Sequence, residues 1–249
     1  MLYGICNLSI VPLRNESSNT SELLSQVLYG EIFKVLEQQK KWSKIRLVFD
    51  NYEGWIDNKQ YKVISEEQYN SINSSEKKYA TDLVEFVQDE NEQIYPITLG
   101  SSLNGLSFLN HSYDGHFTNG ISKKDNLIKT AFLYLNVPSL NGGNTPFGID
   151  CAGFTQMVYK LNGYKLLREV TQQAVQGEVL SFIEESEPGD LAFFDNTEGE
   201  IIHVGIIMKD NYIIHSYGKV KIDRLDHSGI YNVETNTHTH KLRVIKKII

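Results

Sequence analysis

The sequence predicts an α+β protein in which a small β-barrel precedes a half made of helices followed by an antiparallel sheet. Three observations predict this class. Short apolar segments separated by polar turns occupy residues 2–64, apolar residues recur at helical spacing within residues 122–135 and 151–161, and strand-like segments fill the chain beyond Pro188. We therefore divide the chain into residues 1–64, 65–120 and 121–249.

The first 64 residues consist of strand-like segments separated by turns such as RNESSNTSE and FDNYEG. In one of these segments Ile45, Leu47 and Phe49 alternate with other residues, which is the pattern of a half-buried strand. About five short strands in this length favour a small barrel.

The middle region, residues 65–120, is rich in polar residues. Residues 65–78 show little apolar periodicity, so we interpret them as a short helix or linker and place a domain boundary there. Residues 80–102 predict two strands around an acidic turn, and the following segment is rich in Gly, Asn and Ser. We interpret the region as a linker with an incomplete second copy of the small barrel.

Two helices are predicted in the C-terminal half. Ser122 and Asp125 have the spacing of a capping box for a helix that ends before Pro138. The second helix begins near Cys151, and Asn162–Gly163 form its C-terminal cap. Strands are then predicted in the segments GDLAFF, IIHVGIIM, NYIIHSYGKVKI and HKLRVIKKI.

Composition excludes several functional classes. The chain has 249 residues with 24 Lys and Arg against 31 Asp and Glu, so we expect no general binding to nucleic acid or to anionic membranes. Two cysteines give no disulfide framework and are expected as free thiols. Because the first residues lack a leader pattern and no long apolar run follows, we expect a cytoplasmic protein, with a removed signal peptide as the alternative.

Cys151 is the candidate nucleophile. In the first turn of a helix, unpaired backbone N–H groups and the positive end of the helix dipole favour a thiolate, and the same N–H groups can stabilise an oxyanion. The alternative is an ordinary buried cysteine.

A thiol nucleophile also needs a base and a group that orients that base. His203 and His215 each lie within an apolar strand-like segment, where an imidazole is costly without a polar partner. If residues 209–211 form a three-residue loop, position 203 lies opposite 217, and His215 lies on the same face about 7–8 Å away. A two-residue loop would place the two histidines on opposite faces and remove this arrangement. The alternative for each histidine alone is a core residue whose polar atoms have partners.

A metal site is the remaining alternative for these residues. Cys151, His203, His215, His238 and His240 are candidate ligands. The spacing of the histidines is unlike compact zinc motifs, so we expect neither a metal nor a cofactor.

Four segments, FGIDCAGFTQMVY, PGDLAFF, IIHVGIIM and NYIIHSYGKVKID, together resemble the NlpC-type papain-like cysteine peptidases. With residues 1–64 taken as a bacterial SH3-like domain, the chain resembles the dipeptidyl-peptidase VI branch, the γ-D-glutamyl-L-diamino acid endopeptidases of murein peptide recycling. The resemblance implies a papain-like domain at residues 121–249. It also implies Cys151 as nucleophile, His203 as general base and His215 as the residue that orients His203.

The same resemblance implies the substrate, a murein peptide of the type L-Ala-γ-D-Glu-diamino acid with a free N-terminal amine. The matching groups for that amine are Glu22, Tyr52 and Asp150, since carboxylates and a phenol suit an ammonium group. The peptide is the only partner expected, and we expect a monomer.

Four positions depart from the family pattern. Ser139 stands where relatives have an oxyanion-hole tyrosine, and Asn141 replaces a pocket tryptophan. Ala152 follows the nucleophile where serine is usual, and Glu169–Val170 replaces Asp-Ser. Loss of one oxyanion donor costs about 10²–10³ in turnover, so a muropeptide-binding protein with weak catalysis is one alternative function. A secreted hydrolase acting on intact wall is another.

Overall fold

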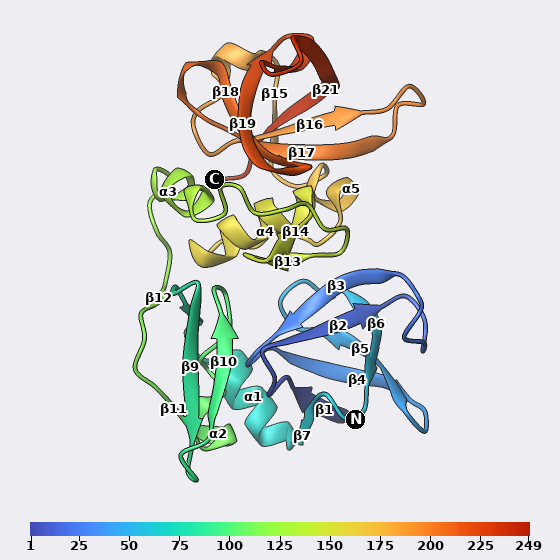
Figure 1. The fold of residues 1–249 in the computed structure, drawn as a ribbon, viewed down its shortest axis with the longest axis vertical. Helices are drawn as coiled ribbons and strands as arrows, with labels where there is room; N and C mark the ends of the chain where they lie inside the picture. The colour runs from blue at the N-terminus through green and yellow to red at the C-terminus, as the bar shows by residue number, and fades with distance from the viewer. The chain divides into compact units, whose positions relative to one another are not determined.

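The computed structural model describes residues 1–249 and divides by internal contacts into two compact units (Figure 1). The first unit comprises Met1–Ile121 and Asn141–Pro146, and the second comprises Ser122–Leu140 and Phe147–Ile249. The boundary that the sequence suggests within residues 65–78 falls inside the first unit. None of the helices is both long and apolar enough to cross a bilayer.

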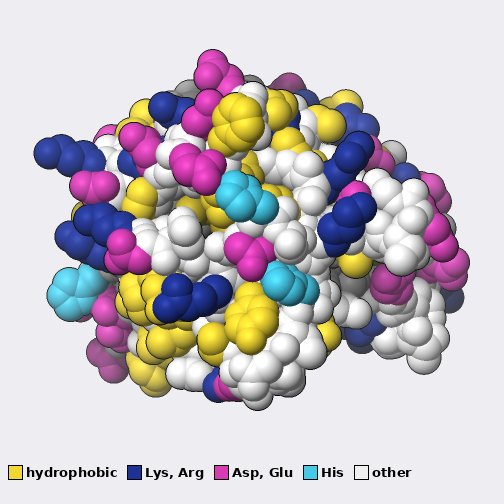
Figure 2. Space-filling model, turned by 90° about the horizontal axis from the view of Figure 1, so that it is seen from above, with side chains coloured by type: hydrophobic (Ala, Val, Ile, Leu, Met, Phe, Trp, Pro, Cys, Tyr) yellow, Lys and Arg dark blue, Asp and Glu magenta, His cyan; other side chains and the backbone are white.

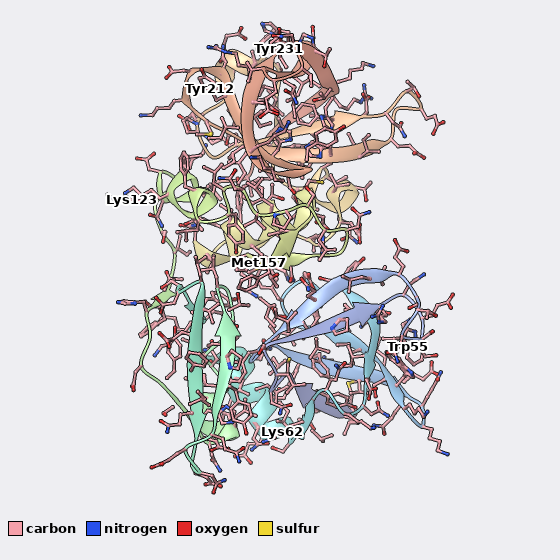
Figure 3. The ribbon with its side chains drawn as sticks, in the orientation of Figure 1. Trp55, Lys62, Lys123, Met157, Tyr212 and Tyr231 are labelled. Carbon is pink, nitrogen blue, oxygen red and sulfur yellow. The ribbon has the colours of Figure 1, made fainter.

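The first unit begins with a seven-stranded antiparallel sheet in the order β3-β2-β6-β5-β4-β1-β7. Alternate side chains of its strands point into one core, which includes Val11, Leu13, Phe33, Ile45 and Ile56. This is the small barrel predicted from the alternating apolar segments. Its strands are β1 (Leu2–Ile5), β2 (Ile10–Arg14), β3 (Leu23–Leu28), β4 (Ile32–Gln38), β5 (Trp42–Leu47), β6 (Glu53–Asp57, with Trp55 labelled in Figure 3) and β7 (Lys62–Ile64).

Residues 65–119 pack on this barrel through a second apolar cluster that contains Ile5 and Tyr29 of the barrel together with Ile72 and Ile97. At Gly30, where φ is +76°, any Cβ would overlap the Ser102 carbonyl oxygen, so the close approach of these two segments requires glycine. The region contains α1 (Glu66–Ser74), β8 (Lys78–Ala80), β9 (Val84–Asp89), β10 (Ile94–Thr98), α2 (Leu106–Leu109), β11 (His111–Tyr113) and β12 (Phe117–Asn119). β9 and β10 are the two strands expected around an acidic turn.

Part of the glycine-rich loop that precedes the candidate nucleophile, residues 141–146, belongs to the first unit. The backbone N–H of Asn144 donates to Gln26 Oε1 at 3.0 Å, and the Asn144 side-chain amide donates to the Gln26 carbonyl at 2.9 Å. Asn144 belongs to β13 (Asn144–Thr145), and Gln26 belongs to β3. Residues 141–146 are therefore fixed to the strand that begins one residue after Glu22.

The helices of the second unit are α3 (Asn126–Phe132), α4 (Cys151–Leu161) and α5 (Val170–Gln173). The capping box expected from Ser122 and Asp125 is wrong, because α3 starts after Asp125, which has helical backbone angles and makes no side-chain cap. The backbone N–H of Ser122 instead donates a hydrogen bond to the Asn162 carbonyl. α4 ends as predicted, with Asn162 as the C-cap and Gly163 at a φ of +84°. Met157 marks the middle of α4 in Figure 3.

The remaining strands form an antiparallel sheet in the order β15-β21-β16-β17-β18-β19-β20, and β21 also pairs with β20. The sheet therefore closes into a six-stranded barrel, coloured orange to red in Figure 1, and α4 packs on β17 and β18. Alternating residues such as Phe194, Ile207, Ile213 and Leu225 fill its interior. The strands of the unit are β14 (Gly148–Ile149), β15 (Glu178–Leu180), β16 (Leu191–Asp195), β17 (Ile201–Ile207), β18 (Tyr212–Tyr217), β19 (Lys219–Asp226), β20 (Gly229–Asn232) and β21 (Thr237–Lys247).

The face seen in Figure 2 carries side chains of both charges, interspersed with each other. Exposed pairs in this unit include His238 with Asp226, whose atoms lie 2.8 Å apart, and His227 with Glu184 at 3.2 Å. Solvent screens such pairs, so they contribute little to stability.

Candidate active site

Cys151 is the first residue of α4, as the sequence predicts, and Asp150 caps this helix. One carboxylate oxygen of Asp150 accepts the Gly153 N–H at 2.6 Å. Arg168, which is only 3% exposed, donates two hydrogen bonds to the same carboxylate at 3.0 and 2.5 Å. Asp150 thus fixes the start of the helix that carries the thiol and neutralises a buried guanidinium.

We expect Asp150→Ala to lower the free energy of unfolding by about 3–5 kcal/mol, because it leaves the Arg168 charge buried without its partner and removes the helix cap. Denaturant unfolding measures the change. Asp125→Ala is the matched control, since Asp125 precedes α3 without capping it, and its effect should stay within about 0.5 kcal/mol. Equal losses in the two variants would contradict this role of Asp150.

The thiol of Cys151 is neutral at rest. Burial, with the nearby Asp150 carboxylate as a second cause, raises the pKa of Cys151 to about 12. Hydrogen bonds from the backbone of Val204 and Ala152 and the charge of Arg168 act in the opposite direction but do not outweigh burial. The expectation of a thiolate stabilised by the helix N-terminus is therefore not met, and a base must remove the proton during the reaction.

His203 is the residue before Val204 on β17, and the backbone of Val204 donates a hydrogen bond to the Cys151 sulfur. His203 Nε2 and His215 Nδ1 are 2.8 Å apart, and both rings are buried. Gly205 pairs with His215 across β17 and β18, so residues 209–211 form the loop of three residues that places both histidines on one face. The predicted adjacency of the two histidines is confirmed.

Asp223 on β19 completes a chain of hydrogen bonds. Its Oδ2 lies 3.1 Å from His215 Nε2 and 2.9 Å from the Lys221 ammonium. Burial acts to raise the pKa of Asp223, but the hydrogen bonds from His215 and Lys221 outweigh it and the pKa is lowered. Asp223 is therefore an ionised acceptor within the barrel, although it is only 2% exposed.

These contacts determine which ring nitrogens carry protons. Burial lowers the pKa of His215, and burial together with the neighbouring His215 holds the pKa of His203 well below its usual value, so both rings are neutral. The carboxylate of Asp223 can only accept, so His215 carries its proton on Nε2 and accepts at Nδ1. His203 then carries its proton on Nε2 and keeps a lone pair on Nδ1. This is the form in which His203 can act as a base.

The oxyanion site differs from the family pattern at Ser139. The Ser216 hydroxyl donates to the Ile149 carbonyl at 2.8 Å, and Ser139 Oγ lies 2.8 Å from Ser216 Oγ. Ser216 has only one hydroxyl proton, so Ser139 must donate to it and has no proton left for an oxyanion. The candidate donors are then backbone N–H groups in the first turn of α4, among them that of Cys151, which have no carbonyl partner within the helix.

The other predicted substrate-binding residues take varied positions. Ala152 is buried, and its carbonyl accepts a hydrogen bond from the Gln173 amide at 2.9 Å. Glu169 is half-buried at the start of α5. Glu22 is exposed before β3, and Tyr52 packs partly buried against the core of the first barrel. Glu22, Tyr52 and the exposed Asn141 belong to the first unit, and their roles stay predictions.

The structure contains no group of three or more His, Cys, Asp or Glu side chains arranged to hold a metal ion. His238 bonds to Asp226, whereas His203 and His215 bond to each other. The metal alternative gains no support from this arrangement.

Comparison with known proteins gives the family. Residues 137–239 match the NlpC/P60 family, and residues 13–60 match the family described as bacterial dipeptidyl-peptidase SH3 domain. The chain carries an NlpC/P60 domain. This confirms the resemblance to NlpC-type cysteine peptidases, the enzyme class, and the α+β fold with an SH3-like domain before the peptidase domain.

Three proteins similar to this chain are informative. The chain is 36% identical over 94 residues to the gamma-D-glutamyl-L-lysine dipeptidyl-peptidase of Bacillus subtilis (strain 168), a match covering 37% of this chain and 31% of that protein. It is 29% identical over 235 residues to the Bacillus cereus (strain ATCC 10987) protein of the same name, and this match covers 80% of this chain and 68% of that protein. The crystal structure of an NlpC/P60 family protein from Bacillus cereus ATCC 10987 has the same fold, with a TM-score of 0.81 at 19% identity over 99% of both chains.

Proposed function

We propose that this NlpC/P60 protein is a cysteine endopeptidase that cleaves the bond between γ-D-glutamate and the diamino acid of murein peptides with a free N-terminal L-alanine. The observation that carries the proposal is the match to the Bacillus cereus gamma-D-glutamyl-L-lysine dipeptidyl-peptidase, which extends over 80% of this chain. The presence of an SH3 domain of the dipeptidyl-peptidase type at residues 13–60 supports it. We propose a cytoplasmic role in recycling wall peptides.

The reaction uses the proton arrangement of the three-residue relay His203, His215 and Asp223. His203 Nδ1 takes the proton of the Cys151 thiol as the sulfur attacks the amide carbon, and a C–S bond forms. The proton on His203 Nε2 stays in its hydrogen bond to His215, which stabilises the imidazolium. His203 then gives the new proton to the departing amine of the diamino acid as the C–N bond breaks. Water, activated by the same nitrogen, releases the glutamyl acid and restores the thiol.

The test compares L-Ala-γ-D-Glu-L-Lys with its N-acetylated form. We expect release of free lysine from the first peptide and at least about a hundredfold lower kcat/KM for the second, because acetylation removes the ammonium charge that carboxylates recognise. Product lysine is measured by chromatography. Equal cleavage of the two peptides would contradict the requirement for a free amine.

The same assay separates the alternatives. Cleavage of purified sacculi at a rate comparable to that of the tripeptide would favour a secreted wall hydrolase. Tight binding of the tripeptide without release of lysine would favour the binding protein, an alternative supported by the engagement of the Ser139 hydroxyl with Ser216. Either result would overturn the proposed recycling function.

A further inference from the structure

His240 lies against the catalytic base, although it lies outside the matched NlpC/P60 residues. The rings of His240 and His203 are stacked, with centroids 4.2 Å apart and an interplanar angle of 25°. The hydroxyl of Thr239 and Nδ1 of His240 are 2.9 Å apart, which fixes the orientation of the His240 ring.

This stacking is not a consequence of simple strand pairing. His203 lies on β17 and His240 on β21, and β16 runs between these two strands, so their backbones are separated by about 10 Å. Phe194 of β16 pairs with both His203 and Leu242, and the register shifts next to Phe194 on both sides. Register shifts of this kind bend a strand and redirect its side chains. The two shifts beside Phe194 therefore account for the meeting of two rings that come from non-adjacent strands.

The stack closes one face of the His203 ring. Nε2 of the same ring forms the hydrogen bond with His215. The rings of Phe194 and Tyr217 flank the His203 ring, with centroids 5.9 and 6.5 Å from its own. His215 restrains one nitrogen but leaves the ring free to tilt about that bond. A stacked neighbour restrains that tilt and so fixes the direction in which Nδ1 points.

We propose that His240 is a positioning residue for His203: it holds the plane of the base by stacking and stabilises the imidazolium formed during the reaction through its π face. The inference rests on the proposed peptidase function. It does not require His240 to exchange a proton or to contact the substrate.

His240 has the electrostatic character that this role requires. Burial, with contributions from His215 and Lys221, lowers the pKa of His240 to about 4, so the ring is neutral at neutral pH. A neutral aromatic ring attracts the cationic imidazolium of His203, whereas a charged one would repel it.

The test uses full-length protein and the tripeptide L-Ala-γ-D-Glu-L-Lys with three variants. We expect His240→Leu to lower kcat about tenfold with KM within twofold of wild type, because leucine fills the space without a π face. His240→Phe keeps the stack and should stay within about threefold of wild type. His238→Leu is the control, since His238 is exposed on the same strand and bonds only to Asp226, and it should leave both parameters unchanged.

Retention of full kcat by His240→Leu would overturn the proposal, as would equal losses in His240→Leu and His240→Phe. A rise in KM with unchanged kcat would overturn it in favour of a substrate contact. Thermal melting of each variant shows whether a loss of kcat reflects unfolding. If His240→Leu is unfolded, the kcat of His240→Phe is compared with that of wild type instead. If wild type itself releases no lysine, the proposed function fails, whereas an active wild type with an unaffected His240→Leu contradicts only the role of His240.

Discussion

Cys151→Ser will reduce kcat for the free tripeptide by at least about 10⁴-fold while the protein stays folded. The hydroxyl is a far weaker acid than the thiol, and His203, whose pKa is held low by burial and by His215, is too weak a base to ionise it. Cys151 is the first residue of α4, and the substitution changes one atom without altering the Asp150 cap. Activity is measured as lysine released, and folding by thermal melting.

The other cysteine of the chain supplies a matched control. Cys6 is 1% exposed, its thiol donates to the Leu8 carbonyl at 3.2 Å, and burial raises its pKa to about 12. Its sulfur belongs to the core of the first barrel. Cys6→Ser is therefore expected to cost stability by burying a hydroxyl and to leave kcat unchanged. Full activity in Cys151→Ser, or loss of kcat in a folded Cys6→Ser, would contradict Cys151 as the nucleophile.

The helix that carries Cys151 and the pairing of His203 with His215 were both accessible from the sequence. Apolar periodicity and the Asn162–Gly163 stop locate α4, and a three-residue loop fixes the register of β17 and β18. Both features depend on residues close together along the chain. Local sequence is enough to determine them.

Asp223 could have been found by the same reasoning. Gly218 has a φ of +71° and separates β18 from β19, so Tyr217 pairs with Lys219 and His215 with Lys221. Asp223 is then a diagonal neighbour of His215 on the same face. The signal was a glycine between two strand-like segments, followed by an acidic residue at an inward position.

His240 and the resting state of the thiol could not be found in this way. The place of His240 depends on β21 returning to β16 and on the register shift beside Phe194, neither of which has a local pattern. The pKa of Cys151 depends on how deeply the packed chain buries the sulfur, and a helix N-terminus alone does not determine that. Both are consequences of long-range packing.

Asp223→Asn is expected to lower kcat by about 10–10²-fold, because a hydrogen bond to a charged group contributes about 1.5–3 kcal/mol. Lys221 and His215 Nε2 both contact the same carboxylate oxygen, Oδ2, so the asparagine amide oxygen takes that place and His215 keeps its proton on Nε2. The amide carries no charge, and it therefore stabilises the imidazolium that forms on His203 less well than the carboxylate does. The barrier to proton transfer from the Cys151 thiol rises as a result.

Asp226→Asn is the matched control for this change, because Asp226 lies on the same strand and bonds the exposed His238 outside the relay. It should leave kcat within about twofold of wild type. Since the loss of this charge leaves the substrate contacts in place, KM for the tripeptide should change little in either variant. A folded Asp223→Asn with wild-type kcat would show that the charge of the carboxylate does not assist the base, and His215 alone would then be sufficient to orient His203.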